Sequence, residues 1–151
     1  MNAALTTNWN TVVSPSDTVI HVGDFAFGNK DLIPGLRARL NGEIILILGN
    51  HDIHRKTGQV LTQIKDAGFK EIHEELYMTV DGTKLYIRHE PKMTWTPGHD
   101  AEYHIAGHVH ESFTRKGSIL NCGVDVNNYR PVTIQQLIAL PEITGKSHRG
   151  F

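Results

Sequence analysis

The sequence has little cysteine, no long apolar run and no excess of charge of either sign. Its single cysteine, Cys122, excludes an internal disulfide framework and a cysteine-rich zinc module. No window approaches the roughly 18 apolar residues of a membrane span. Residues 1–13 contain no basic residue, so they do not resemble a targeting segment. We therefore expect a cytoplasmic protein without a membrane partner.

The balance of charged residues gives no sign of a large charged partner. The 15 lysines and arginines almost balance the 16 aspartates and glutamates, and no basic run breaks that balance. A broad cationic face for nucleic acid is therefore disfavoured, so nucleic acid is expected only as a substrate. Histidine, in contrast, is abundant: there are 10, and five of them lie between residues 89 and 110. Because histidine is the commonest metal ligand, this excess points to a site.

The length of 151 residues fits one compact domain. In its first half, helices are predicted over residues 2–13, 32–40 and 60–67, and strands over 18–22 and 43–48. This alternation favours an α/β layer with parallel strands.

The second half is predicted to be antiparallel. Asp81-Gly82 is a strong hairpin signal between strands over residues 76–80 and 84–89. Two further strands are expected over 103–106 and 118–122. Thr133 and Gln136 form a capping box for a last helix that reaches Leu140. Residues 141–151 have no periodicity and are expected to be a mobile tail.

Polar clusters follow three of the predicted strands, at the positions where open α/β sheets bind ligands. They are Gly23-Asp24-Phe25, Gly49-Asn50-His51-Asp52 and Gly107-His108-Val109-His110, and His89 ends a further strand. Each cluster alone could be a turn, a helix cap or a hydrogen-bonded histidine. Together, in this order, they predict a site with mixed oxygen and nitrogen ligands, which suits Mn²⁺, Fe or Zn²⁺.

These motifs resemble the calcineurin-like metallophosphoesterase superfamily, and above all its small bacterial and phage members. The resemblance covers residues 2 to about 140 and includes His89 with Pro91, and the segments 121–126 and 129–132. It implies an α/β fold: a two-sheet metallophosphoesterase-type sandwich flanked by helices, with a two-metal site across the strand ends.

Carried over residue by residue, the resemblance implies five metal ligands: Asp24, Asn50, His89, His108 and His110. Asp24 would bridge the two metals, and His110 would bind the second. His51 would be the catalytic histidine, with Asp52 holding its ring. Divalent ions are implied, one or two per chain, with Mn²⁺ first and Fe, Zn²⁺ or Ni²⁺ as alternatives.

One family motif is missing. The Asp-x-His that ends the family's first strand has no counterpart upstream of Asp24, and the only such triplet, Asp52-Ile53-His54, belongs to the second cluster. We therefore expect the first strand of the sandwich to be missing. One metal keeps four implied ligands, whereas its neighbour keeps only Asp24 and His110.

The resemblance implies a phosphoesterase, most specifically a phosphodiesterase, that acts on a small-molecule phosphoester through metal-activated water. His51, protonated and oriented by Asp52, would act as general acid. Three explanations of the incomplete site remain open: a shortened enzyme with reduced activity, a homodimer that shares ligands or a strand, and a metal-binding scaffold or interaction module without turnover.

Residues outside these motifs carry weaker expectations. His54, Arg55 and Lys56 could contact a substrate phosphate, and residues 93–104 could form a lid over the site. His21 lies within a predicted strand, where we expect its ring to be packed and hydrogen-bonded.

Overall fold

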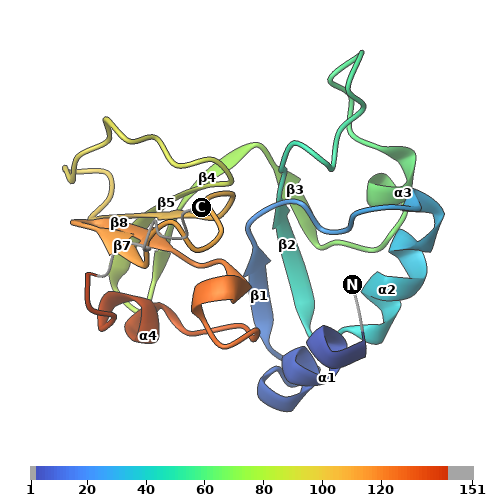
Figure 1. The fold of residues 1–151 in the computed structure, drawn as a ribbon, viewed down its shortest axis with the longest axis horizontal. Coiled ribbons are helices and arrows are strands. Elements are labelled where there is room, and N and C mark those ends of the chain that lie inside the picture. Colours follow the sequence, from blue (N-terminus) through green and yellow to red (C-terminus); the bar gives the residue numbers. More distant parts are fainter. Residues whose placement is uncertain (1–2, 143–151) are drawn as a thin grey trace.

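The computed structural model describes residues 3–142. Helix α1 (Ala3–Val12) leads into a parallel three-stranded sheet with the order β1 (Thr18–His21), β2 (Glu43–Ile47) and β3 (Glu71–His73). The chain between these strands forms η1 (Lys30–Leu32), α2 (Ile33–Arg39) and α3 (Thr62–Lys65). In Figure 1 these helices lie along one side of the first sheet.

The second sheet is mixed rather than antiparallel. Its order is β4 (Glu75–Val80), β5 (Thr83–Arg88), β6 (Tyr103–Ala106), β8 (Ile119–Asn121) and β7 (Arg115–Lys116). β4 and β5 form the predicted antiparallel hairpin, but β5–β6 and β6–β8 are parallel pairs. The expectation of an antiparallel second half was therefore wrong, because the long connections after β5 and β6 return the chain in the same direction.

The helix α4 (Ile134–Ile138) closes the chain against the second sheet. It begins with the predicted capping box: the Thr133 side chain accepts from the Gln136 amide, and the Gln136 side chain accepts from the Thr133 amide. The helix packs Ile134 and Leu137 into the second core. Nine of the residues expected to form a mobile tail, 143–151, lie outside the described part of the chain.

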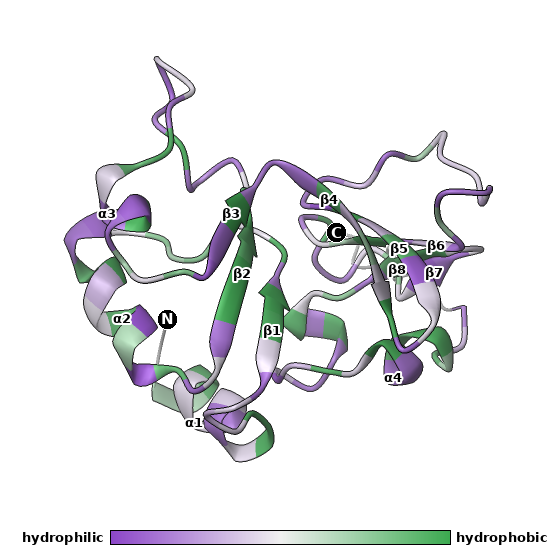
Figure 2. Cartoon of the chain, turned by 180° about the vertical axis from the view of Figure 1, so that it is seen from behind, coloured by the Kyte–Doolittle hydropathy of each residue, from purple (hydrophilic) through white to green (hydrophobic). Residues whose placement is uncertain are grey.

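Two apolar cores hold the sandwich together, and β2 contributes to both. Ile44 and Leu46 point into the core between the first sheet and the helices, whereas Ile47 points into the core of the second sheet. Successive side chains of a strand alternate between faces, so a strand covered on both sides must be apolar throughout. Figure 2 shows the resulting apolar colour along β2. The two-sheet α/β sandwich is confirmed.

Strand β1 lies at the edge of its sheet. Within residues 3–142 it pairs only with β2, and a groove of about 1360 Å³ runs along its other side. The sequence had predicted the helices and most strands, but not β3 or β7. These strands have three and two residues, too few to show an alternating pattern.

Residues 90–102 connect β5 to β6 and contact the second sheet through Trp95. Its ring stacks on Tyr86 and lies against His104, and the Lys92 amide donates to His104 Nε2 at 2.9 Å. The role of this segment as a lid stays a prediction. No helix within the described residues is long and apolar enough to cross a bilayer.

Because β2 contributes side chains to both cores, its buried leucine should stabilise the fold more than an exposed leucine does. Leu46 is fully buried, whereas Leu32 is 58% exposed. We expect Leu46→Ala to lower the free energy of unfolding by about 2–5 kcal/mol, because it removes methyl groups from a packed core. The matched control, Leu32→Ala, should change it by less than about 0.5 kcal/mol. Urea unfolding followed by circular dichroism measures both, and equal effects would contradict this view of the core.

Candidate metal centre

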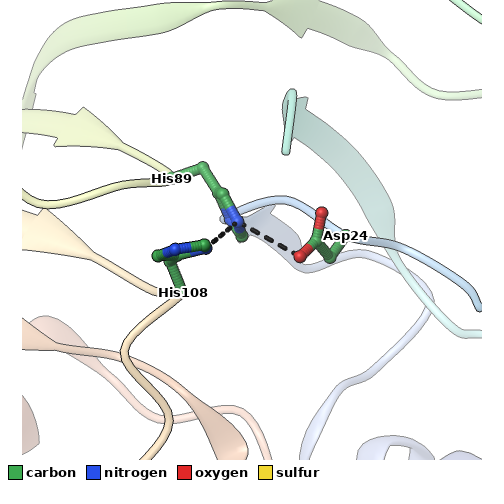
Figure 3. A group of neighbouring side chains, drawn as sticks. All are labelled: Asp24, His89 and His108. Atoms are coloured by element: carbon green, nitrogen blue, oxygen red, sulfur yellow. Dashed lines mark hydrogen bonds and ion pairs between the residues drawn. The ribbon is translucent and has the colours of Figure 1, made fainter. Parts of the chain in front are cut away.

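Four of the five predicted ligands meet where strands of the two sheets end. Asp24 follows β1, Asn50 follows β2, His89 follows β5 and His108 follows β6. Single ligand atoms of Asp24, His89 and His108 lie within 4.8 Å of one another. Figure 3 shows these three side chains directed toward a common point from separate segments of the chain.

His89 is the central side chain of this group. Its Nδ1 lies 2.7 Å from the carbonyl oxygen of Val22, which can only accept a hydrogen bond. Nδ1 therefore carries the hydrogen, and in the neutral ring Nε2 presents a lone pair. A backbone carbonyl on the far nitrogen is the arrangement that orients histidine ligands in metal sites.

Three polar atoms of other side chains surround His89 Nε2. Asn50 Oδ1 lies at 3.1 Å, Asp24 Oδ2 at 3.2 Å and His108 Nδ1 at 3.2 Å. Asn50 Oδ1 and Asp24 Oδ2 offer lone pairs to a cation, and each histidine ring offers one on its unprotonated nitrogen. The donor set of one carboxylate, one amide oxygen and two imidazoles fits Mn²⁺, Fe or Zn²⁺. These residues therefore fit a divalent metal.

The backbone around the centre is strained. Asp24, His108 and His110 have positive φ values of 55°, 64° and 49°, in the left-handed region that residues with a side chain rarely occupy. Such conformations cost of order 1–3 kcal/mol each and cluster at functional sites. Strain at three predicted ligands supports a functional role for these loops.

Two of the glycines that precede the clusters are required by close packing. A Cβ on Gly23 would overlap the His89 ring, and a Cβ on Gly49 would overlap the Asp24 carboxylate. Gly23 also has a positive φ of 91°, which glycine adopts without steric cost. In the structure, the His89 and Asp24 side chains occupy the space that a Cβ at Gly23 or at Gly49 would fill.

The Asp52 carboxylate binds backbone amides next to the predicted ligands. Asp52 is fully buried, and its carboxylate accepts hydrogen bonds from the amides of Asp24, Phe25 and Gly49 at 2.8–2.9 Å. The expected contact with the His51 ring is not among its hydrogen bonds within the described residues. Aspartate side chains commonly bind backbone amides in turns, so the position of Asp52 three residues after Gly49 was a sequence signal for this role.

His51 is exposed and acts on the centre through its backbone. Its amide donates to Asp24 Oδ1 at 2.8 Å, and this bond orients the carboxylate. Its ring packs edge-on against Phe27, with centroids 4.7 Å apart. Phe27 is 59% exposed, and its contact with His51 was not predicted from the sequence.

His110, the fifth predicted ligand, is not joined to the group around His89. Its Nδ1 lies 3.0 Å from Asp125 Oδ2, on the exposed side of the centre. Buried Asn121 holds this loop in place, because its Nδ2 donates to the carbonyl oxygens of His110 and Phe113. Asn121 and Asp125 lie in the segment that carried the family resemblance, but sequence reasoning gave neither a role.

His21 lies below the centre between aromatic rings. Its centroid is 6.3 Å from that of Trp9 and 5.2 Å from that of Phe25. The expected packing is present, but buried Nδ1 has no hydrogen-bond partner within residues 3–142, so this part of the expectation was wrong. Burial lowers the pKa of His21, while the nearby Asp52 carboxylate opposes that shift.

Comparisons with known proteins show which family the chain resembles. A family model described as the calcineurin-like phosphoesterase superfamily domain matches residues 1–128. An uncharacterized protein of Methanocaldococcus jannaschii, MJ1445, is 31% identical over 150 residues, which cover 94% of this chain and 76% of the relative.

Two solved structures are also similar. The protein of unknown function AQ665 from Aquifex aeolicus shares the fold, with a TM-score of 0.65 and 23% identity over 91% of this chain and 83% of that one. A structure described as a novel archaeal phosphodiesterase gives a TM-score of 0.45 and 26% identity over 71% of this chain and 67% of that one.

Because Asp52 accepts hydrogen bonds from three backbone amides, even its nearly isosteric replacement by asparagine should destabilise the protein. Asp52→Asn replaces one acceptor oxygen with an NH₂ donor that faces backbone N–H groups. We expect the free energy of unfolding to fall by about 2–3 kcal/mol, because at least one buried amide loses its partner. Chemical denaturation measures the change, with the exposed Asp31→Asn as control. Equal stability of the two variants would contradict the capping role of Asp52.

The lone pairs around His89 Nε2 predict stabilisation by metal. Mn²⁺ at about 100 times its Kd should add roughly 2.7 kcal/mol to the stability of the protein. Thermal unfolding with and without EDTA measures this effect. His89→Ala should abolish it, whereas the control His99→Ala, whose side chain is 95% exposed, should retain it. A metal-induced shift that survives His89→Ala would contradict the site.

Proposed function

The chain belongs to the calcineurin-like phosphoesterase superfamily, and on that basis we propose that it is a metal-dependent phosphodiesterase. The observation that carries this proposal is the convergence of Asp24, Asn50 and His108 on the lone-pair nitrogen of His89. The reaction is hydrolysis: water adds to phosphorus, and the ester oxygen leaves as an alcohol.

We assign one complete metal position to Asp24, Asn50, His89 and His108. Mn²⁺ is our first choice, with Fe, Zn²⁺ and Ni²⁺ as alternatives that suit the same donors. A divalent metal bound there supplies Lewis-acid activation of water and neutralises charge that develops on the phosphoryl oxygens. A second ion would use Asp24 and His110, and would compete for the imidazole that is now paired with Asp125.

His51 is our candidate for the general acid. Its ring is exposed beside the proposed metal ligand Asn50, and its amide is fixed by the Asp24 carboxylate. A proton held on this ring would pass to the departing ester oxygen. Asp52 contributes indirectly: it fixes the backbone on both sides of Gly49 and Asp24, and is therefore a positioning residue.

The alternative is a metal-binding scaffold or interaction module without turnover. The pairing of His110 with Asp125 favours it, because this bond occupies one of the two family ligands, Asp24 and His110, that would hold a second metal. Both candidates bind metal, so only turnover separates them.

We propose a single domain that works in the cytoplasm on small phosphoesters. A homodimer in which the free edge of β1 pairs with another copy stays a prediction, which the mass in solution tests.

The acid role of His51 predicts the effect of its removal. The protein with Mn²⁺ should hydrolyse bis-p-nitrophenyl phosphate, and His51→Ala should lower kcat at least 100-fold, in the range typical of a lost general acid. Release of p-nitrophenol measures the rate, with the exposed His99→Ala as control. Full activity of His51→Ala would contradict the acid role. Metal binding without turnover of the unmodified protein, for each of the four metals, would favour the scaffold.

A further inference from the structure

A second feature of the same face has no role in the proposed chemistry. A pocket of about 410 Å³ opens beside the metal centre and shares Asn50 and His51 with it. Pockets of this size bind small ligands in many proteins. We call it the basic pocket, because its remaining polar lining consists of Lys30, His54, Arg55 and Lys56.

The charge of the basic pocket stands out from the rest of the chain. The protein has a formal net charge of −1, yet three full cations line this cavity and no carboxylate does. The nearby acidic side chains are engaged elsewhere: Asp52 binds backbone amides, and Asp31 accepts from Gln63. Within residues 3–142, Lys30, Arg55 and Lys56 form none of the ion pairs, which lie at other side chains.

A closed hairpin presents two of these cations. Residues 53–60, which we call the basic hairpin, are joined by a bridge between Ile53 and Val60. The His54 amide donates to Gln59, and the Leu61 amide donates to Asp52 at the base. Arg55 and Lys56 are exposed near its tip. In Figure 1 this segment, between β2 and α3, projects from the body of the molecule.

Lys30 completes the pocket from a different segment. It lies at the start of η1, is partly buried, and its Nζ donates to the Ala26 carbonyl oxygen at 2.6 Å. An ammonium group has three N–H donors, so this anchor leaves two of them for a ligand. The pocket thus combines one anchored ammonium group with a guanidinium and an ammonium group that remain free to bind.

We propose that the basic pocket binds a second phosphate group of the substrate. Arginine and lysine around a small concave site are the chemistry that recognises phosphate. Because the pocket shares His51, our candidate acid, the second phosphate belongs to the leaving group. The substrate class is therefore a phosphodiester whose leaving alcohol carries a further phosphate, as in a short phosphorylated oligonucleotide. This inference rests on the proposed function.

The test compares thymidine dinucleotides that differ only in a terminal phosphate. One has no terminal phosphate, one carries it at the 5′ end and one at the 3′ end, so either direction of cleavage is covered. Chromatography of the products with Mn²⁺ gives kcat/KM for each. We expect at least one phosphorylated dinucleotide to be preferred about tenfold or more, as a charge-assisted hydrogen bond allows.

The double variant Arg55→Ala/Lys56→Ala should lose this preference, and the preference should weaken in high salt. The matched control, Arg39→Ala/Lys65→Ala, removes the same charge from exposed positions on α2 and α3 and should keep the preference. Equal rates on all three dinucleotides, or a preference that survives the double variant, would overturn the inference.

Hydrolysis of bis-p-nitrophenyl phosphate separates this inference from the proposed function. Turnover of that ester without a preference among the dinucleotides overturns only the inference. Without any turnover the proposed function fails, and calorimetry with inorganic pyrophosphate in EDTA then tests the pocket. Binding that the Arg55→Ala/Lys56→Ala variant abolishes would support a phosphate site, and no binding would overturn it.

Discussion

The hydrogen bond between His89 and the carbonyl of Val22 joins the two sheets at the metal centre, and the rest of the site depends on it. Val22 follows an edge strand of the first sheet, whereas His89 follows a strand of the second. The bond links the two sheets at this point and fixes the tautomer of the ring. The Gly107 amide, which donates to the His89 carbonyl, then brings the His108 loop to the same point.

Buried carboxylate and amide groups extend this constraint to the loops. Asp52 binds three amides across two loops, and Asn121 holds the loop that carries His108 and His110. The strained conformations of Asp24 and His108 persist because these contacts determine the backbone more strongly than local preference does. The predicted ligands are therefore preorganised, and the cost of their arrangement is met by folding.

The two sides of the centre differ in a way that bears on activity. On one side, four donors surround a single point. On the other, His110 is paired with Asp125 and exposed to solvent. The basic pocket is lined in part by His51, and its charge comes from lysine and arginine side chains. This division is the basis of our two proposals, in which one position activates water and the neighbouring cavity binds the leaving group.

Much of this could be predicted from the sequence, because local patterns report local structure. Apolar runs predicted the buried strands, and the pair Thr133 and Gln136 predicted the last helix. The polar clusters with their glycines predicted the loops that carry the ligand candidates. The direction of the strands in the second sheet could not be predicted, since connection length alone does not determine it.

The sequence by itself determined which side chains could bind a metal and on which strands they lie. Only the tertiary structure decided how they are used: that Asp52 turns inward to backbone amides, that His110 pairs with Asp125, and that His21 lacks a partner for Nδ1. These outcomes depend on distances between segments far apart in the chain. No local pattern encodes such distances, because they are set by the packing of one sheet on the other.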